Sequence, residues 1–163
     1  MRHYVNSAHV ITISDGASHG KRDDKSGPAL VGILYANQYE VTGPEIVPDE
    51  RDRIAAAITK AADGGSNFVI TTGGTGLGPR DVTPQATASV IDYDVPGLTE
   101  LMRRAGLEST PMAALTRGLA GVRGQTLVIN VPGSPKGAVE SLEAVMPVLE
   151  HALALLRGDT KHE

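Results

Sequence analysis

The sequence predicts an α/β protein, a three-layer α/β/α sandwich around a mostly parallel sheet. Short runs rich in Val and Ile alternate with longer segments in which apolar residues recur at helical spacing. Most of these runs are almost continuously apolar, as is typical of strands buried on both faces of a parallel sheet. Parallel strands need crossover helices, and these cover both faces. No linker, repeat or low-complexity tract divides residues 1–163, so we expect a single domain.

The apolar runs give the strands, and the periodic segments give the helices. We expect strands at residues 9–14, 39–47, 67–72 and 126–131. We expect helices at residues 26–37, 49–63, 84–91, 96–105 and 134–156. Ser26 with Pro28 is typical of a helix start, and Gly64-Gly65 is typical of a helix end. Pro147 predicts a kink or an early break in the last helix.

The composition excludes several classes of function. The net charge is −4 and aromatic residues make up 3% of the chain, so we expect no nucleic-acid partner. Cysteine is absent, which excludes disulfides, thiolate metal sites and a cysteine nucleophile. No apolar run approaches membrane-spanning length and no secretory leader is present, so we expect a cytoplasmic protein without a membrane partner.

The fold class also predicts where a ligand binds. In parallel α/β sheets, ligands bind where the carboxyl ends of strands meet the amino ends of helices. The loops to consider follow Ser14, Val47, Thr72 and Val131.

The loop after the third strand is rich in glycine. Residues 70–81 read ITTGGTGLGPRD, which is neither a Walker loop nor a dinucleotide-binding fingerprint. Its backbone amides could surround a phosphate or a carboxylate. The alternative is a tight turn in which glycine supplies positive φ. Asp81 either closes an Asx turn or is available for a ligand, because Thr83 is the expected cap of the next helix.

Asp49, in the VPDE segment, has two interpretations as well. With Asp52 it resembles the capped start of a helix, where both acids suit the helix dipole. If Asp49 instead faces the same crevice as Asp81, two carboxylates near one anionic ligand indicate a divalent cation between them.

The loop after the first strand is long and polar. It is either a solvated surface loop or a flexible flap over a ligand. In the second case Ser14 and Asp15 lie at its base, and Asp24, Lys25 and Ser26 lie where the next helix begins.

The loop after the last strand reads PGSPKG. Ser134 suits a helix start, and Gly133 lets a ligand approach the backbone closely. Lys136 opposes the helix dipole, which favours a role with an anion. Thr116 and Arg117 are either ligand contacts or surface residues, and their spacing does not distinguish the two.

As a set, these motifs resemble the molybdenum cofactor biosynthesis proteins of the MogA/MoaB type. TTGGTGLGPRDVTPQAT, VPDE, SD followed by DDKSGPAL, PGLTELMR, AGVRG and NVPGSPKG occur in that family's order and cover nearly the whole chain. The resemblance implies a homotrimer with a molybdopterin-binding fold. It also implies an adenylyltransferase that moves AMP from Mg-ATP to the terminal phosphate of molybdopterin and releases pyrophosphate. A downstream molybdate-inserting enzyme would receive the product.

The resemblance further implies roles for matching residues. Asp49 matches a catalytic carboxylate near ATP and its Mg²⁺, and Asp81 matches a second catalytic carboxylate close to molybdopterin. The residues expected to bind molybdopterin are Thr72, Gly73, Gly74, Thr75, Gly76, Arg80, Thr116, Gly133, Ser134 and Lys136. Those expected on the nucleotide side are Ser14, Asp15, Asp24, Lys25 and Ser26.

Two positions depart from the family's commoner pattern, and three alternative functions stay open. Thr116 stands where Ser is usual but keeps the hydroxyl, and Gln85 replaces an acid, which we interpret as a capping change.

One alternative function is a non-catalytic molybdopterin-binding or carrier protein; the presence of Asp49 argues against it, because some relatives lack this aspartate. A nucleotide-pyrophosphatase relative is expected to need a longer chain. A structural trimer with a vestigial site is the third.

Overall fold

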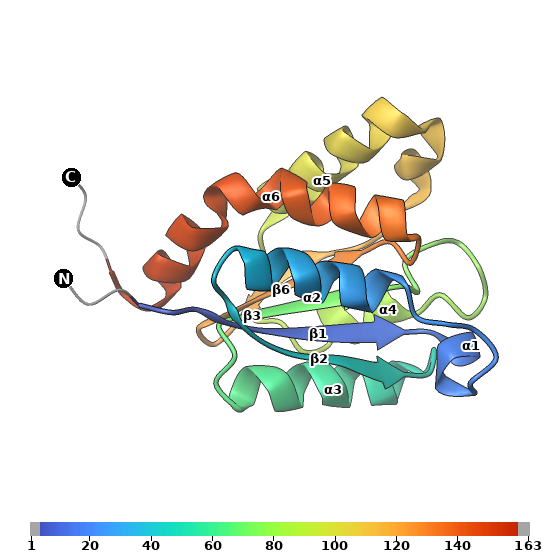
Figure 1. The fold of residues 1–163 in the computed structure, drawn as a ribbon, viewed down its shortest axis with the longest axis horizontal. Helices are drawn as coiled ribbons and strands as arrows, with labels where there is room; N and C mark the ends of the chain where they lie inside the picture. Colours follow the sequence, from blue (N-terminus) through green and yellow to red (C-terminus); the bar gives the residue numbers. More distant parts are fainter. Residues whose placement is uncertain (1–3, 160–163) are drawn as a thin grey trace.

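The computed structural model describes residues 4–159 of the chain (Figure 1). The elements in chain order are β1 (Ser7–Ile13), α1 (Asp15–Ser18), α2 (Ser26–Ala36), β2 (Glu40–Val47), α3 (Arg51–Asp63), β3 (Phe68–Thr72), α4 (Thr83–Ala88), β4 (Tyr93–Asp94), α5 (Pro96–Ser109), the 3₁₀ helix η1 (Pro111–Leu115), β5 (Ala120–Arg123), β6 (Thr126–Val131) and α6 (Pro135–Leu156). Among residues 4–159, every helix falls short of the length and apolarity that a bilayer crossing requires.

The strands form one sheet with helices on both faces. Its order is β2-β1-β3-β6-β5-β4. β2, β1, β3 and β6 run parallel, whereas β5 is antiparallel to both β6 and β4. α2, α5 and α6 cover one face, and α3 and α4 cover the other (Figure 1). The predicted α/β/α sandwich around a mostly parallel sheet is confirmed.

The two central strands show why their sequences do not alternate between apolar and polar residues. Every residue of β3 and β6 is buried. Phe68 and Ile70 pack in the layer of α2, α5 and α6, while Val69 between them packs against α3 and α4. Successive side chains of a strand point to opposite faces, so a strand covered on both faces needs apolar residues at consecutive positions.

The last helix differs from the prediction at Pro147. α6 runs without a break from Pro135 to Leu156, so the early break is wrong. Pro147 and Glu143, the residue whose carbonyl loses its helical partner, are both exposed, so water can reach that carbonyl. Leu142 and Leu149 stay on the buried face, and their packing holds the helix together across the proline.

The start of α2 also differs from the prediction. Ser26 is buried inside the first turn and does not cap the helix. Asp24 accepts the Gly27 amide at 2.9 Å and the Thr12 hydroxyl at 2.7 Å. Asp24 therefore does the capping and also ties the helix start to β1.

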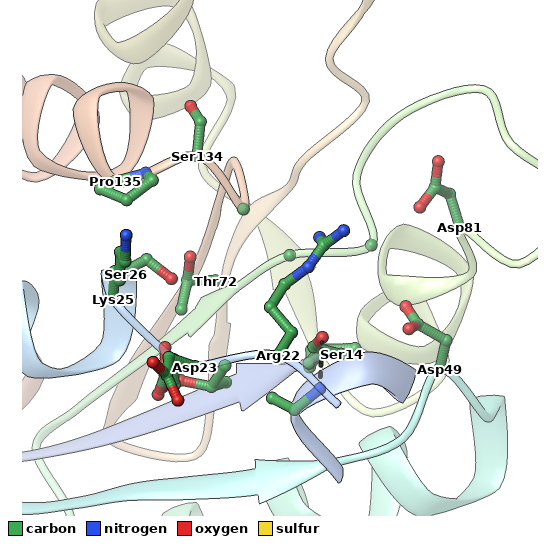
Figure 2. Close-up of a pocket in the computed structure, with 17 residues that line it drawn as sticks. Ser14, Arg22, Asp23, Lys25, Ser26, Asp49, Thr72, Asp81, Ser134 and Pro135 are labelled. Atoms are coloured by element: carbon green, nitrogen blue, oxygen red, sulfur yellow. Dashed lines mark hydrogen bonds between the residues drawn. The ribbon is translucent and has the colours of Figure 1, made fainter. Parts of the chain in front are cut away.

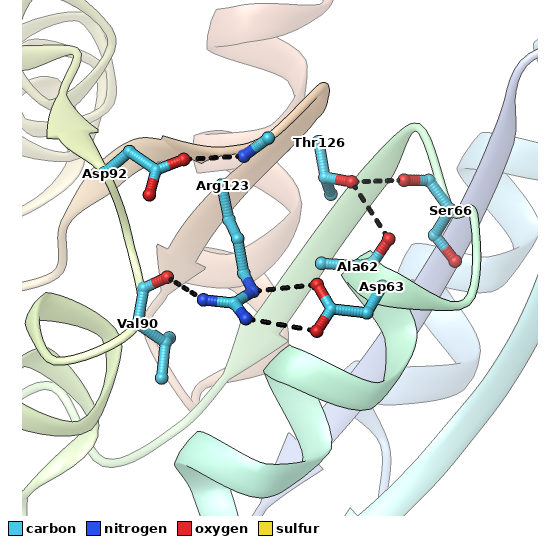
Figure 3. Close-up of polar contacts among 8 residues, drawn as sticks. Ala62, Asp63, Ser66, Val90, Asp92, Arg123 and Thr126 are labelled. Atoms are coloured by element: carbon cyan, nitrogen blue, oxygen red, sulfur yellow. Dashed lines mark hydrogen bonds and ion pairs between the residues drawn. The ribbon is translucent and has the colours of Figure 1, made fainter.

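Arg123 joins the antiparallel edge of the sheet to the helices on one face (Figure 3). Its Nε and Nη2 atoms donate to the two carboxylate oxygens of Asp63 at 3.0 and 3.1 Å, and Nη1 donates to the Val90 carbonyl at 2.9 Å. The guanidinium thus connects β5 to the end of α3 and to the turn after α4. Arg123 is far in sequence from both Asp63 and Val90, so sequence patterns do not predict these contacts.

Candidate functional site

A polar cavity of about 740 Å³ opens at the carboxyl ends of β1, β3 and β6 (Figure 2). This is the edge of the sheet at which the fold class places ligands. Eleven of the residues expected at the site line the cavity: Ser14, Asp24, Lys25, Ser26, Asp49, Thr72, Gly73, Gly74, Asp81, Gly133 and Ser134. Residues from four separate loops therefore meet in one space.

A second cavity of about 280 Å³ has a more apolar wall. The expected residues Thr75, Gly76 and Thr116 line it, together with apolar side chains that include Met102 and Met112. Ser134, at the start of α6, lines both cavities, so the two adjoin there. The sequence predicts one crevice, whereas the structure divides the expected residues between two.

Three expected residues line neither cavity. Asp15, the first residue of α1, contacts Asp49 and Arg80 instead. The Arg80 guanidinium donates two hydrogen bonds to Asp15, and Arg80 lines neither cavity. Lys136 is 78% exposed, and its Nζ lies 3.8 Å from Glu140, one turn further along α6. The structure therefore does not bring Lys136 to the place where an anion would bind.

The glycine loop combines a tight turn with close approach to the cavity. Gly73 has φ +106°, and a Cβ there would lie 2.2 Å from the carbonyl oxygen of Ile13. Thr83 donates its hydroxyl to the Gly73 carbonyl at 2.9 Å and is fully buried, so the expectation that Thr83 caps α4 is wrong. The tight turn with positive φ is therefore confirmed at Gly73, which also lines the cavity, and binding of an anion by the loop stays a prediction.

Asp81 and Arg117 hold the far part of this loop. Asp81 Oδ2 accepts the Gly78 amide at 2.9 Å, which closes a short turn. Arg117 donates from Nε to the Gly76 carbonyl at 2.9 Å and from Nη2 to the Asp81 carbonyl at 2.8 Å. One carboxylate oxygen of Asp81 is thus committed to the loop while the side chain still lines the larger cavity.

Asp49 is not a helix cap. α3 begins after Glu50, which forms no side-chain cap. Asp49 Oδ2 instead accepts the Asp15 amide at 2.8 Å, and Asp15 Oδ1 accepts the Asp49 amide at 3.0 Å. Burial raises the pKa of Asp49, and the negative charges of Asp15 and Asp81 add to the increase. The pKa of Asp15 is lowered, chiefly by its hydrogen bond with Arg80. The helix-cap interpretation of Asp49 is therefore wrong.

The loop after β1 supplies a cation that the sequence analysis missed. Its first residues form α1, capped by the Ser14 hydroxyl, which accepts the Ala17 amide at 3.1 Å. Arg22 follows and extends into the larger cavity (Figure 2). Gly16 leaves room for this side chain, because a Cβ on Gly16 would lie 3.3 Å from the Arg22 Cβ. None of the ion pairs formed within residues 4–159 includes Arg22. The signal in the sequence was the basic Lys21-Arg22 pair inside a loop already considered a flap.

The arrangement suits two ligands that meet at one point. The larger cavity contains the cations of Arg22 and Lys25, exposed glycine backbone, and the carboxylates of Asp49 and Asp81. The smaller one offers an apolar wall with hydroxyl groups. No group of three or more His, Cys, Asp or Glu side chains within residues 4–159 could enclose a metal ion. A cation at Asp49 would therefore need most of its ligands from water or from a bound phosphate.

Comparison with known proteins gives consistent matches. Residues 9–151 match the family described as "Probable molybdopterin binding domain". The chain is 43% identical over 154 residues to the molybdopterin adenylyltransferase of Helicobacter pylori, covering 92% of this chain and 87% of that protein. It is 39% identical to a molybdenum cofactor biosynthesis bifunctional protein of Synechococcus elongatus, covering 93% of this chain and 47% of that protein. The crystal structure of the molybdopterin biosynthesis enzyme MoaB from Thermus thermophilus superposes with a TM-score of 0.89 at 52% identity, covering 94% of this chain and 98% of that one.

Proposed function

Because this chain belongs to the molybdopterin-binding domain family of molybdenum cofactor biosynthesis, we propose that it is a molybdopterin adenylyltransferase. In this reaction an oxygen of the terminal phosphate of molybdopterin attacks the α-phosphorus of ATP. The bond from the α-phosphorus to the bridging oxygen breaks, and pyrophosphate leaves. The observation that carries the proposal is the junction of two unlike cavities at Ser134, next to the carboxylates of Asp49 and Asp81.

The two substrates divide between the cavities by their chemistry. ATP takes the larger, polar cavity, where Arg22 and Lys25 offset the triphosphate charge. The pterin takes the smaller one, where methionine side chains contact its ring and Thr116 offers a hydroxyl. Thr116 is held by Arg103, which also lines this cavity and donates Nη2 to the Thr116 carbonyl at 3.2 Å.

The reacting phosphate of the pterin then lies at the junction. Gly73 and Gly133 allow close approach of the backbone, and the positive end of the α6 helix dipole lies beside Ser134. The residues expected there follow β3 and β6, two fully buried strands, so both substrates meet at the ends of rigid elements.

Magnesium enters with ATP as part of the substrate. Asp49 Oδ2 is engaged by the Asp15 amide, and none of the hydrogen bonds within residues 4–159 uses Asp49 Oδ1. One carboxylate oxygen plus substrate phosphates is the usual environment of Mg²⁺ at a nucleotide. Asp49 therefore fits as the protein's ligand to Mg-ATP. Asp81, from the loop that reaches toward the pterin, orients the attacking phosphate.

No protein nucleophile is needed for this chemistry. Both reacting groups are anionic, so catalysis rests on positioning and on charge neutralisation by the magnesium and the two cations. The finding that Asp49 is not used to cap a helix favours this catalytic role over a carrier function.

The wider setting follows from the same assignment. We propose a homotrimer in the cytoplasm that passes the adenylylated pterin to a molybdate-inserting enzyme. The bifunctional relative supports a partner in the same pathway, because this chain corresponds to 47% of that protein and the rest carries further sequence.

The test is pyrophosphate release from Mg-ATP with and without molybdopterin freshly liberated from a molybdoenzyme. Release that requires molybdopterin supports the adenylyltransferase. Binding of molybdopterin without any release would leave a carrier protein and overturn the proposal.

A further inference from the structure

Arg80 lies at the far end of the glycine loop and holds Asp15, the first residue of α1. Its Nε donates to Asp15 Oδ2 at 3.0 Å, and its Nη2 donates to Asp15 Oδ1 at 3.0 Å. A guanidinium that contacts both oxygens of one carboxylate fixes the plane of that carboxylate as well as its position. The partners lie 65 residues apart in the chain, so this contact connects the loop after β3 to the loop after β1.

Asp15 in turn fixes Asp49. Each of the two residues donates its backbone amide to the carboxylate of the other, at 2.8 and 3.0 Å. The Asp15 Oδ1 atom accepts from both Arg80 and the Asp49 amide, so one oxygen joins three loops. A shift of Arg80 is therefore transmitted to Asp49 through a short series of hydrogen bonds.

We propose that Arg80 is a positioning residue, which orients Asp49 through Asp15 and binds neither substrate. Arg80 lies outside both cavities and its guanidinium is paired with both carboxylate oxygens of Asp15, which argues against direct contact with molybdopterin. The kinetic part of this inference rests on the proposed adenylyltransferase function; the geometric part does not.

The same connection couples the two substrate cavities. Thr75 and Gly76 of the glycine loop line the smaller cavity, and Arg80 lies four residues beyond Gly76 in that loop. Arg117 holds the segment between them through the carbonyls of Gly76 and Asp81. The glycine loop therefore joins the wall of the smaller cavity to Asp15 and, through Asp15, to Asp49.

The kinetic test compares Arg80→Gln, Asp15→Asn and the double variant, with Arg104→Gln as a control for an exposed arginine on α5. We expect each single variant to lower kcat by about 10- to 100-fold while the KM for molybdopterin changes by less than about 2-fold. The double variant should be no slower than Asp15→Asn alone, because Arg80 acts only through Asp15. A raised KM for molybdopterin with unchanged kcat in Arg80→Gln, or additive losses in the double variant, would overturn the proposal.

A second readout does not depend on the reaction. Hydrogen exchange of the Asp49 amide, followed by NMR on the labelled protein, reports the bond to Asp15 directly. We expect exchange to accelerate by about 10-fold or more in Arg80→Gln and to stay unchanged in Arg104→Gln. Unchanged exchange in Arg80→Gln would contradict the positioning role. A wild-type protein that releases no pyrophosphate but shows this acceleration would separate failure of the proposed function from failure of this inference.

Discussion

Asp15 and Asp49 each accept the other's backbone amide, at 3.0 and 2.8 Å, although 34 residues separate them. This exchange holds the end of β1 against the loop after β2. It leaves the Asp49 carboxylate partly buried among other acids, which raises its pKa. A carboxylate held in this way is costly for the fold to keep unless a cation or a reaction uses it.

Asp49→Asn should abolish turnover while sparing pterin binding. The amide can still accept the Asp15 N–H, so the local fold is preserved, but its charge no longer attracts magnesium. We expect pyrophosphate release to fall by about 100-fold or more. Equilibrium dialysis should give an unchanged affinity for molybdopterin.

The matched control for this variant is Asp52→Asn, an exposed aspartate in the first turn of α3. It should release pyrophosphate at the wild-type rate. Wild-type turnover in Asp49→Asn would contradict the role given to Asp49.

Arg22→Ala should weaken ATP binding. The side chain extends into the larger cavity from an exposed loop, so its removal deletes a cation without altering the core. We expect the KM for ATP to rise by about 10-fold, the effect of one charge-assisted contact, with little change in the KM for molybdopterin. Arg104→Ala removes the same charge elsewhere and should leave both constants unchanged. An unaltered KM for ATP in Arg22→Ala would exclude contact with the triphosphate.

Gly73→Ala should destabilise the protein more than a glycine substitution that disturbs the backbone alone. Gly124 has φ +59° with no atom within 4 Å of an added Cβ, so Gly124→Ala reports backbone strain and should cost about 1–2 kcal/mol. At Gly73 the added Cβ would also lie 2.2 Å from the Ile13 carbonyl, so we expect a loss of about 3 kcal/mol or more. Urea denaturation of the two variants measures both values, and equal losses would show that close approach at Gly73 is unimportant.

Asp63→Asn should lower stability at neutral pH but not in acid. The hydrogen bonds from Arg123 lower the pKa of Asp63 below its ordinary value of 3.8 (Figure 3). Because the folded-state pKa lies below the unfolded value, the pair contributes its full stability above pH 3.8 and loses it as the pH falls through the folded-state pKa. Thermal midpoints of the wild type and the variant should therefore differ at pH 7 and converge in acid. A difference independent of pH would contradict this account of the pair.

The sequence predicts the long elements well because a buried face needs apolar residues at the spacing of a strand or a helix, and that spacing is visible in the sequence. β3 and β6 are buried on both faces and read as continuous apolar runs, and the recurring leucines of α6 mark its buried face. β4 and β5 were missed, since they span two and four residues and β5 contains Gly121. Close packing decides their pairing: a Cβ on Gly121 would lie 2.8 Å from the Tyr93 carbonyl oxygen.

The candidate site also has features that the sequence predicts and features that only the folded structure decides. The loops that contain it could be predicted, because parallel strands bring their carboxyl ends to one edge. The partner of each polar side chain could not. Asp49 and Thr83 both resemble helix caps in sequence, yet each uses its side chain on a residue brought close only by the fold. The division into two cavities likewise depends on α5 and η1, whose side chains enclose the smaller one.

The most direct test of the central claim is transfer of label from α-phosphate-labelled ATP. With magnesium and molybdopterin present, the account predicts that label moves to the pterin in equal amount to the pyrophosphate released, and that Asp49→Asn abolishes the transfer. If molybdopterin binds but all of the label stays in ATP, the chain is not an adenylyltransferase.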